Sequence, residues 1–319
     1  MTDWLRLAAA TAVVLAPGFA VARALGRRGA SAGLAWALVA IGVGLAIAFA
    51  VGGSIWLVLG IVLGAGALAL PLSRRRPRRP GGGGLVALAG LAFGGALWFV
   101  EGPIGGDGIF HLARVRKLDA FGSLSLRAVD EFRDGGLHPG YAFPLWHGFL
   151  ALVAKVAAVD PSVVMRHEPS LLAPLAFLVA YEAGRAVVGT GWGGVAVVLA
   201  QVAMFALAAG HGGGYVVLTN PGTAARQLLA PATIALFFTA LEERRRAAYA
   251  TLGAVTLCAT LVHPAFSVFA LLPLAGYAVV RLLVARREAR ETGTALAFAT
   301  VPVAAVLVWL KPLVDKQQR

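Results

Sequence analysis

The run LVALAGLAFGGALWFV (residues 85–100) is followed at once by EGPIGGDGIFHLARVRKL (residues 101–118), and this junction decides how the chain folds. An apolar run of this kind is typical of a membrane-spanning helix, because about 20 apolar residues cross a hydrocarbon layer roughly 30 Å thick. The polar residues that follow must then lie outside the hydrocarbon. The sequence therefore predicts a membrane helix that ends in a segment rich in reactive side chains.

The composition of the whole chain agrees with this interpretation. Of 319 residues, 59% are hydrophobic and 13% are charged, and the mean hydropathy is +0.80, whereas soluble chains carry roughly 25% charged residues. We expect an all-α, polytopic helical membrane protein with about ten transmembrane helices. The expected spans are residues 4–22, 31–50, 54–72, 85–100, 169–188, 191–210, 225–241, 247–263, 265–284 and 293–310. The first of them is also compatible with a signal peptide.

Arginines in short loops predict the orientation, since basic loops stay on the cytoplasmic side. Residues 73–84, SRRRPRRPGGGG, carry five of them. This orientation places both termini outside, and it holds only if residues 144–159 form an interfacial or re-entrant helix that does not cross. We expect an N-terminal three-span module (1–80) and a seven-span core (81–319) with a long outer loop (101–168) carrying amphipathic helices. The net charge of +13 lies in these loops and not in a basic stripe with aromatics, so no nucleic-acid partner is expected.

The outer loop holds eight of the fifteen acidic residues and four of the six histidines. Asp107 begins a helix predicted over 108–120, and His111 and Arg114 share its face by their spacing. A carboxylate at this place can act as a general base or hold a divalent cation such as Mg or Mn against a phosphate. It can equally be a simple helix N-cap.

Further polar side chains are predicted on the same side of the membrane. Asp130, Glu131 and Asp134 form a second acidic group, which suits either shared acid/base and metal duties or a solvated loop. The predicted substrate- or phosphate-binding residues are His111, Arg114, His138, His147, Arg226 and His263. No nucleotide-binding loop and no zinc-ligand spacing occurs, so no nucleotide cofactor is expected.

Three stretches in order resemble the GT-C superfamily of membrane glycosyltransferases: GDGIFHLARVRKL after a span, then HPGYAFPLWHGFLALVAKV, and later LVHPAFSVFALLPLAGY. The resemblance covers roughly residues 85–310. It implies a polyprenyl-phosphate-linked sugar as donor, Asp107 as catalytic base, Glu131 or Asp130 as second acid, and Arg226 and Arg114 as ligands of the lipid phosphate. Any metal would be held by Asp107 and Glu131.

The expected function is transfer of this sugar to a glycan, lipid or protein acceptor of the cell envelope, at the outer face of a plasma membrane. Compared with many GT-C members, we expect three additional early spans and, because the sequence ends at KPLVDKQQR, no soluble outer domain. It is expected to be a minimal enzyme, a truncated one, or one that is inactive alone. Two alternatives stay open: a transporter or flippase of lipid-linked sugars, and a non-catalytic scaffold with the same shape.

Overall fold

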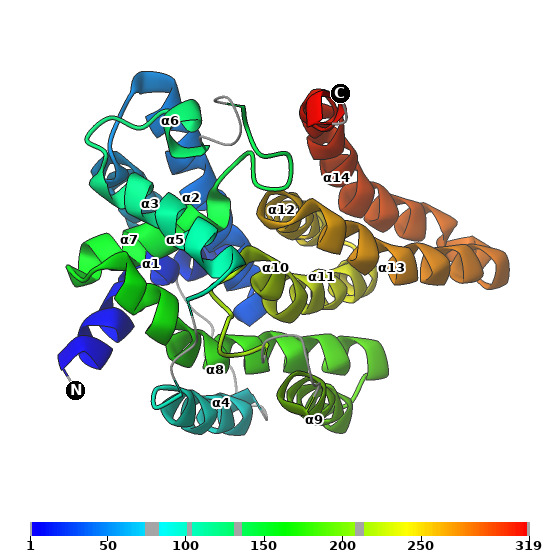
Figure 1. Ribbon diagram of the computed structural model, residues 1–319. Helices are drawn as coiled ribbons and strands as arrows, with labels where there is room; N and C mark the ends of the chain where they lie inside the picture. Colours follow the sequence, from blue (N-terminus) through cyan, green and yellow to red (C-terminus); the bar gives the residue numbers. More distant parts are fainter. Residues whose placement is uncertain (1, 74–82, 101–103, 131–135, 208–213, 318–319) are drawn as a thin grey trace.

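The computed structural model describes residues 2–73, 83–100, 104–130, 136–207 and 214–317, and these ranges contain helices and no β-strand (Figure 1). The α-helices are α1 Thr2–Ala24, α2 Ala30–Val51, α3 Ile55–Ala69, α4 Gly83–Leu97, α5 Asp107–Ala120, α6 Leu126–Asp130, α7 Leu145–Ala157, α8 Pro161–Val188, α9 Gly191–Leu207, α10 Pro221–Ala224, α11 Ala230–Glu243, α12 Arg246–Val262, α13 Pro264–Val284 and α14 Ala289–Gln317. Two short elements complete the chain: the π-helical turn η1 Ala225–Leu229 and the 3₁₀ turn η2 Arg286–Glu288. The all-α prediction is confirmed.

Within the described residues, six helices are long and apolar enough to cross a membrane: α1, α2, α8, the continuous helix Pro221–Glu243, α13 and the helix that contains α14. Four shorter apolar helices, α3, α4, α9 and α12, coincide with the other expected spans. At 1.5 Å per residue the 15 residues of α3 extend only about 22 Å. A helical membrane protein is therefore supported, while the number of about ten crossings stays a prediction.

Large apolar side chains are exposed on the outer faces of these helices, including the shorter ones. Leu68 of α3, Leu85 of α4 and Val284 of α13 are each at least three-quarters exposed. Apolar surface on this scale is costly in water, whereas it matches the hydrocarbon of a bilayer. The perimeter of the bundle is therefore suited to face lipid.

Glycines set the closest helix contacts. A Cβ atom added at Gly90 of α4 would lie 2.6 Å from the Cα of Pro174 in α8, and one at Gly94 would lie 2.1 Å from the carbonyl oxygen of Ser170. This small-xxx-small spacing lets two helix backbones touch without side chains between them. It fixes α4 against α8, beside which α9 also packs (Figure 1).

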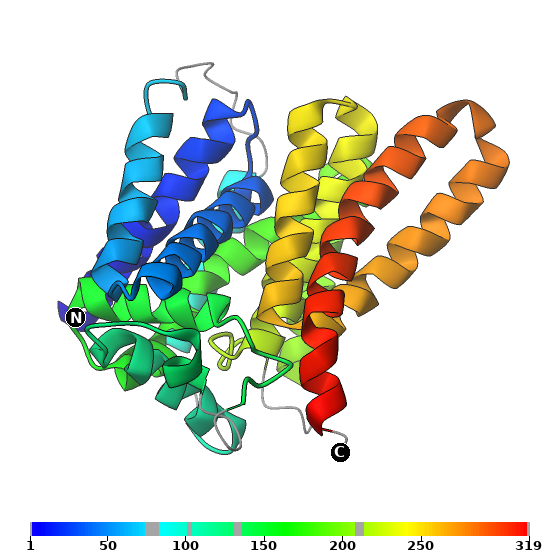
Figure 2. The same ribbon diagram turned by 90° about the horizontal axis from the view of Figure 1, so that it is seen from above.

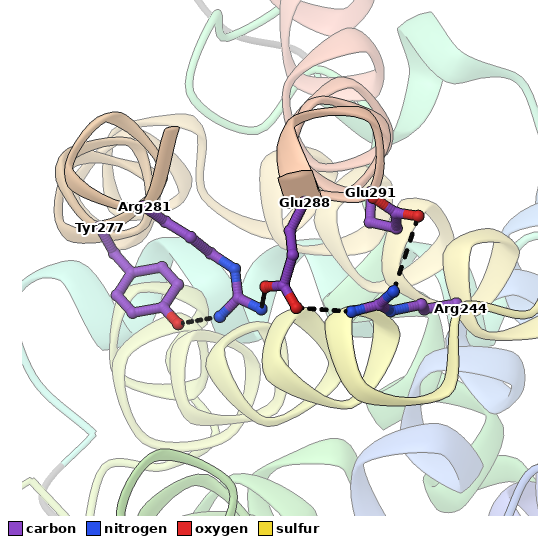
Figure 3. A network of polar contacts seen from close by, with 5 residues as sticks. All are labelled: Arg244, Tyr277, Arg281, Glu288 and Glu291. Atoms are coloured by element: carbon purple, nitrogen blue, oxygen red, sulfur yellow. Dashed lines mark hydrogen bonds and ion pairs between the residues drawn. The ribbon is translucent and has the colours of Figure 1, made fainter. Parts of the chain in front are cut away.

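The two ends of the bundle differ in chemistry. The turns α1–α2, α11–α12 and α13–α14 lie at one end, while α5, α6 and both termini lie at the other (Figure 2). The first end carries arginines that join neighbouring turns (Figure 3): Arg244 contacts Glu288 at 2.8 Å and Glu291 at 3.7 Å, and Arg281 pairs with the same Glu288. This separation agrees with the threading expected from the loop arginines. Which end faces the cytoplasm stays a prediction.

The surroundings of α7 differ from those of the interfacial helix expected over 144–159. The helix lies across the ends of α1–α3 (Figure 2) and packs on α1, α2, α5 and α8. Its polar stripe and its apolar side are both buried, for example His147 and Phe149. Lys155 and Val156 are partly exposed, and the Nζ atom of Lys155 donates to the carbonyl of Asp119 in α5 at 2.9 Å. Because protein covers almost all of its faces, α7 is a buried crosswise helix.

Polar contacts join the first two helices to the remainder of the chain. Trp36 of α2 donates to Thr251 of α12 at 3.1 Å. Glu182 of α8 accepts hydrogen bonds from the amides of Ala30 and Ser31, at the N-terminus of α2. A carboxylate at this position stabilises the positive end of the helix dipole. The division at residue 80 remains a prediction, and these helices share one hydrophobic core with later ones.

Candidate functional site

Asp107 is the first residue of α5, and its side chain is 68% exposed. The N-cap position is occupied by Gly106, whose φ of 53° suits glycine, and no side chain caps the helix. The carboxylate of Asp107 instead contacts His111, one turn later, with Oδ2 and Nε2 3.0 Å apart. The buried His111 therefore fixes the carboxylate of Asp107, while most of the Asp107 side chain remains exposed.

A second histidine lies behind the first. His111 Nδ1 is 3.0 Å from Nε2 of His147 in α7, and both rings are almost completely buried. Burial lowers the pKa of His111 to about 4, although Asp107 acts in the opposite direction. Burial, and next the neighbouring His111, also lower the pKa of His147 well below its usual value. The two imidazoles are thus neutral near pH 7 and form a buried chain that ends at Asp107.

Arg114, one turn beyond His111, forms a buried ion pair with Asp130 at the end of α6. The Nη1 atom of Arg114 also donates to the carbonyl of Tyr141 at 2.8 Å, and Asp130 accepts from the amide of His138. Burial lowers the pKa of Arg114 to about 10. These contacts tie α5, α6 and the segment 136–144 together. Since both side chains are at most 3% exposed, the pair itself offers little surface to a substrate.

Aromatic and imidazole rings surround Tyr141. Its ring centroid lies 5.0 Å from that of His111, 5.0 Å from that of His138 and 5.7 Å from that of His263. Burial raises the pKa of Tyr141 to about 12, with a smaller effect from Asp107. Burial lowers the pKa of His138. The half-buried rings near Asp107 provide flat faces against which an apolar or sugar-like surface can pack.

His263 and Arg226 bring the second half of the chain to the same region. His263 joins α12 to α13, and a Cβ atom at Gly222 would lie 3.4 Å from its ring. Arg226 lies in the π-helical turn, with its guanidinium 5.3 Å from the ring centre of Phe266. Such turns are frequent at functional sites. The segment just before α10 and this π-helical turn is held by the buried Trp146 of α7, whose indole N–H donates to the carbonyl of Thr219 at 2.8 Å.

Six predicted site residues therefore gather at one end of the bundle: Asp107, His111, Arg114, Asp130, His138 and His147. His263 and Arg226 belong to the same region, since the ring of His263 lies 5.7 Å from that of Tyr141 and 4.7 Å from that of Phe266, on which the guanidinium of Arg226 lies. Glu131 and Asp134 lie outside the described residues. Within the described ranges no three His, Cys, Asp or Glu side chains are arranged to hold a metal ion. The Mg or Mn site of Asp107 and Glu131 accordingly stays a prediction.

The burial of one acidic residue, Glu168, was not predicted, because α8 begins earlier than expected. Asp160 caps this helix by accepting from the amide of Ser162 at 2.8 Å, and Pro161 occupies its first turn. Glu168, expected at the end of the outer loop, therefore lies inside a long apolar helix. It is fully buried, with Oε1 2.7 Å from the hydroxyl of Thr11 in α1. The helix-start signal Asp160-Pro161-Ser162 in the sequence predicts the earlier beginning of α8, and with it a helical position for Glu168.

Comparison of the chain with family models, with curated proteins and with solved structures gives no match. Three properties of the site bear on its function: one outward carboxylate, a buried histidine chain behind it, and a ring of aromatic side chains beside it.

Proposed function

We propose that the protein is a membrane glycosyltransferase that moves a sugar from a polyprenyl-phosphate donor to a hydroxyl of a cell-envelope acceptor. The observation that supports this best is the outward carboxylate of Asp107, held by His111 at the end of a bundle suited to lipid. A general base must reach the acceptor hydroxyl and keep a fixed orientation. Asp107 combines both properties.

In the proposed reaction, Asp107 takes the proton of the acceptor hydroxyl. The acceptor oxygen forms a bond to the anomeric carbon of the sugar, and the bond from that carbon to the phosphate oxygen breaks. Polyprenyl phosphate leaves with the bonding electrons and the negative charge. No nucleotide and no oxidant is needed, which agrees with a sequence that has no nucleotide-binding loop.

Arg226 and His263 are the proposed partners of the lipid phosphate, because they lie at one end of the bundle on helices that continue along the apolar core. An arginine suits a phosphate through its paired N–H donors. The rings around Tyr141 are the proposed contact of the sugar. The polyprenyl chain would remain in the bilayer beside the exposed apolar faces. We place the site at the outer face of a plasma membrane, with the arginine-bearing end in the cytoplasm.

The decisive experiment measures release of polyprenyl phosphate from a panel of lipid-linked sugars by the purified full chain. The Asp107→Asn variant should lose at least about 100-fold in rate, as expected for loss of a general base. The Asp119→Asn variant is the control, because it changes the same residue type on the same helix, away from the histidine chain. Equal rates for wild type and Asp107→Asn would disprove the role of the base.

One observation favours a second candidate, a transporter of lipid-linked sugars. Glu168 is a fully buried carboxyl group within an apolar helix, and intramembrane acids often line ion or substrate pathways. This candidate predicts movement of a labelled polyprenyl sugar across proteoliposomes without any transfer, and loss of that movement in Glu168→Gln. If instead neutralising Asp107 and Glu168 leaves envelope assembly intact in cells, a non-catalytic scaffold would be favoured.

A further inference from the structure

The direction of the hydrogen bonds behind Asp107 follows from counting protons. A carboxylate offers acceptors only, so the 3.0 Å contact between Asp107 and His111 requires a hydrogen on His111 Nε2. The second contact joins His111 Nδ1 to His147 Nε2, also at 3.0 Å, and one of these two nitrogens must donate. Two arrangements satisfy both contacts.

In the first arrangement His111 is neutral, so its Nδ1 accepts and His147 Nε2–H donates. In the second arrangement His111 is an imidazolium that donates from both nitrogens, and His147 accepts. The second requires a positive charge on a ring that is 0% exposed and lies one helical turn from Arg114, another cation. The carboxylate of Asp107 attracts this charge only weakly, because its side chain is 68% exposed to solvent. Burial of a charge without solvation is far more costly than burial of a neutral ring. The environment therefore selects the first arrangement.

We propose that His147 is a positioning residue that, through its Nε2–H, fixes the tautomer of His111 and thereby the orientation of Asp107. This inference rests on the proposed function for its kinetic consequence, while its structural part concerns the histidines alone. Without a donor at His147, the hydrogen of neutral His111 is held on Nε2 by Asp107 alone, whose carboxylate is 68% exposed and therefore also solvated by water. In the other tautomer, a lone pair of His111 would face the carboxylate of Asp107, and the contact would become repulsive.

The burial of α7 explains how the Nε2–H donor of His147 is kept in a fixed position. His147 is 1% exposed, and the neighbouring Trp146 is anchored to the carbonyl of Thr219. The ring of Tyr141 lies against both histidines, with centroid distances of 5.0 Å to His111 and 6.0 Å to His147. The contact between the two histidine rings is thereby shielded from water, so its hydrogen-bond order is set by the protein.

Two substitutions at His147 separate the donor from the shape of the side chain. In His147→Gln the side-chain amide can donate from about the position of Nε2, whereas His147→Met has a similar length and no donor. We expect kcat to fall about 10–100-fold in His147→Met, by analogy with supporting hydrogen bonds in other sites. His147→Gln should stay within about threefold of wild type, and KM for the lipid donor should be unchanged in both.

A second measurement does not depend on activity. The full chain labelled with ¹⁵N-histidine, in detergent micelles at neutral pH, should show His111 and His147 as neutral rings protonated at Nε2, with signals assigned from His111→Gln and His147→Gln. An imidazolium or an Nδ1-protonated ring at His111 would refute the proposal, as would equal kcat for the Met and Gln variants. If no preparation transfers sugar but the expected tautomers are present, the hydrogen-bond order stands and the proposed function fails.

Discussion

Replacement of Arg114 by methionine should destabilise the protein more than any other single change at the site. Arg114 and Asp130 are paired with side-chain exposures of 2% and 1%, so water cannot screen the charge that remains. The variant Arg114→Met leaves the carboxylate of Asp130 buried with only the amide of His138 as a partner, and it removes the hydrogen bond to the carbonyl of Tyr141.

The expected magnitude follows from the burial of the pair. Removing one partner of a buried ion pair costs about 3–5 kcal/mol in free energy of unfolding, whereas replacing both partners by apolar side chains is often neutral or stabilising. The double variant Arg114→Met with Asp130→Leu should therefore recover most of the loss. It will not recover all of it, because the carbonyl of Tyr141 and the amide of His138 still lose their partners at about 1 kcal/mol each.

The assay is reversible unfolding in detergent micelles, followed by tryptophan fluorescence, to which the buried Trp146 of α7 contributes. Lys311→Met is the control, because its ion pair with Asp315 lies exposed on α14 and its loss should change stability little. The reasoning is refuted if Arg114→Met costs less than about 1 kcal/mol, or if the double variant is as unstable as the single one.

Two further predictions concern helix packing and helix capping. Gly94→Ala should strongly reduce the yield of folded protein, because its Cβ would lie 2.1 Å from the carbonyl oxygen of Ser170. Gly95→Ala should be tolerated, because a Cβ atom there would have no atom within 4 Å. Size-exclusion profiles in detergent compare the two variants, and equal profiles would contradict the close contact between α4 and α8. Asp160→Ala should cost about 1 kcal/mol by removing the cap of α8. Because hydrogen bonds from Ser162 and then Arg116 lower the pKa of Asp160 from 3.8 to about 2, its contribution is present above pH 3.8 and is lost as the pH falls towards 2. Unfolding of wild type and Asp160→Ala between pH 6 and pH 2 measures this, and a constant difference in stability across that range would contradict it.

Much of the local structure was predictable from the periodicity of the sequence. The helix expected over 108–120 is α5, and Asp107, His111 and Arg114 lie on one face of it as predicted. That His111 and Arg114 are buried on this face was not predicted. The prediction of a shared face succeeds because helical spacing fixes which side chains share a face wherever the helix lies. The beginning of α8 was predicted eight residues too late, at residue 169 and not at Pro161, because the expectation followed hydropathy and not the capping residues.

By itself, the sequence determined the helical class, the positions of most apolar helices and which side chains share one face of α5. Only the tertiary structure decided the partners: His111 meets His147, 36 positions away, Arg114 meets Asp130, and α7 is enclosed between α5 and the first helices. The physical reason is that hydropathy and spacing encode how each helix divides into buried and exposed faces. They do not encode which buried face meets which, since that depends on shape, on close glycine contacts and on polar groups that must find partners across the chain.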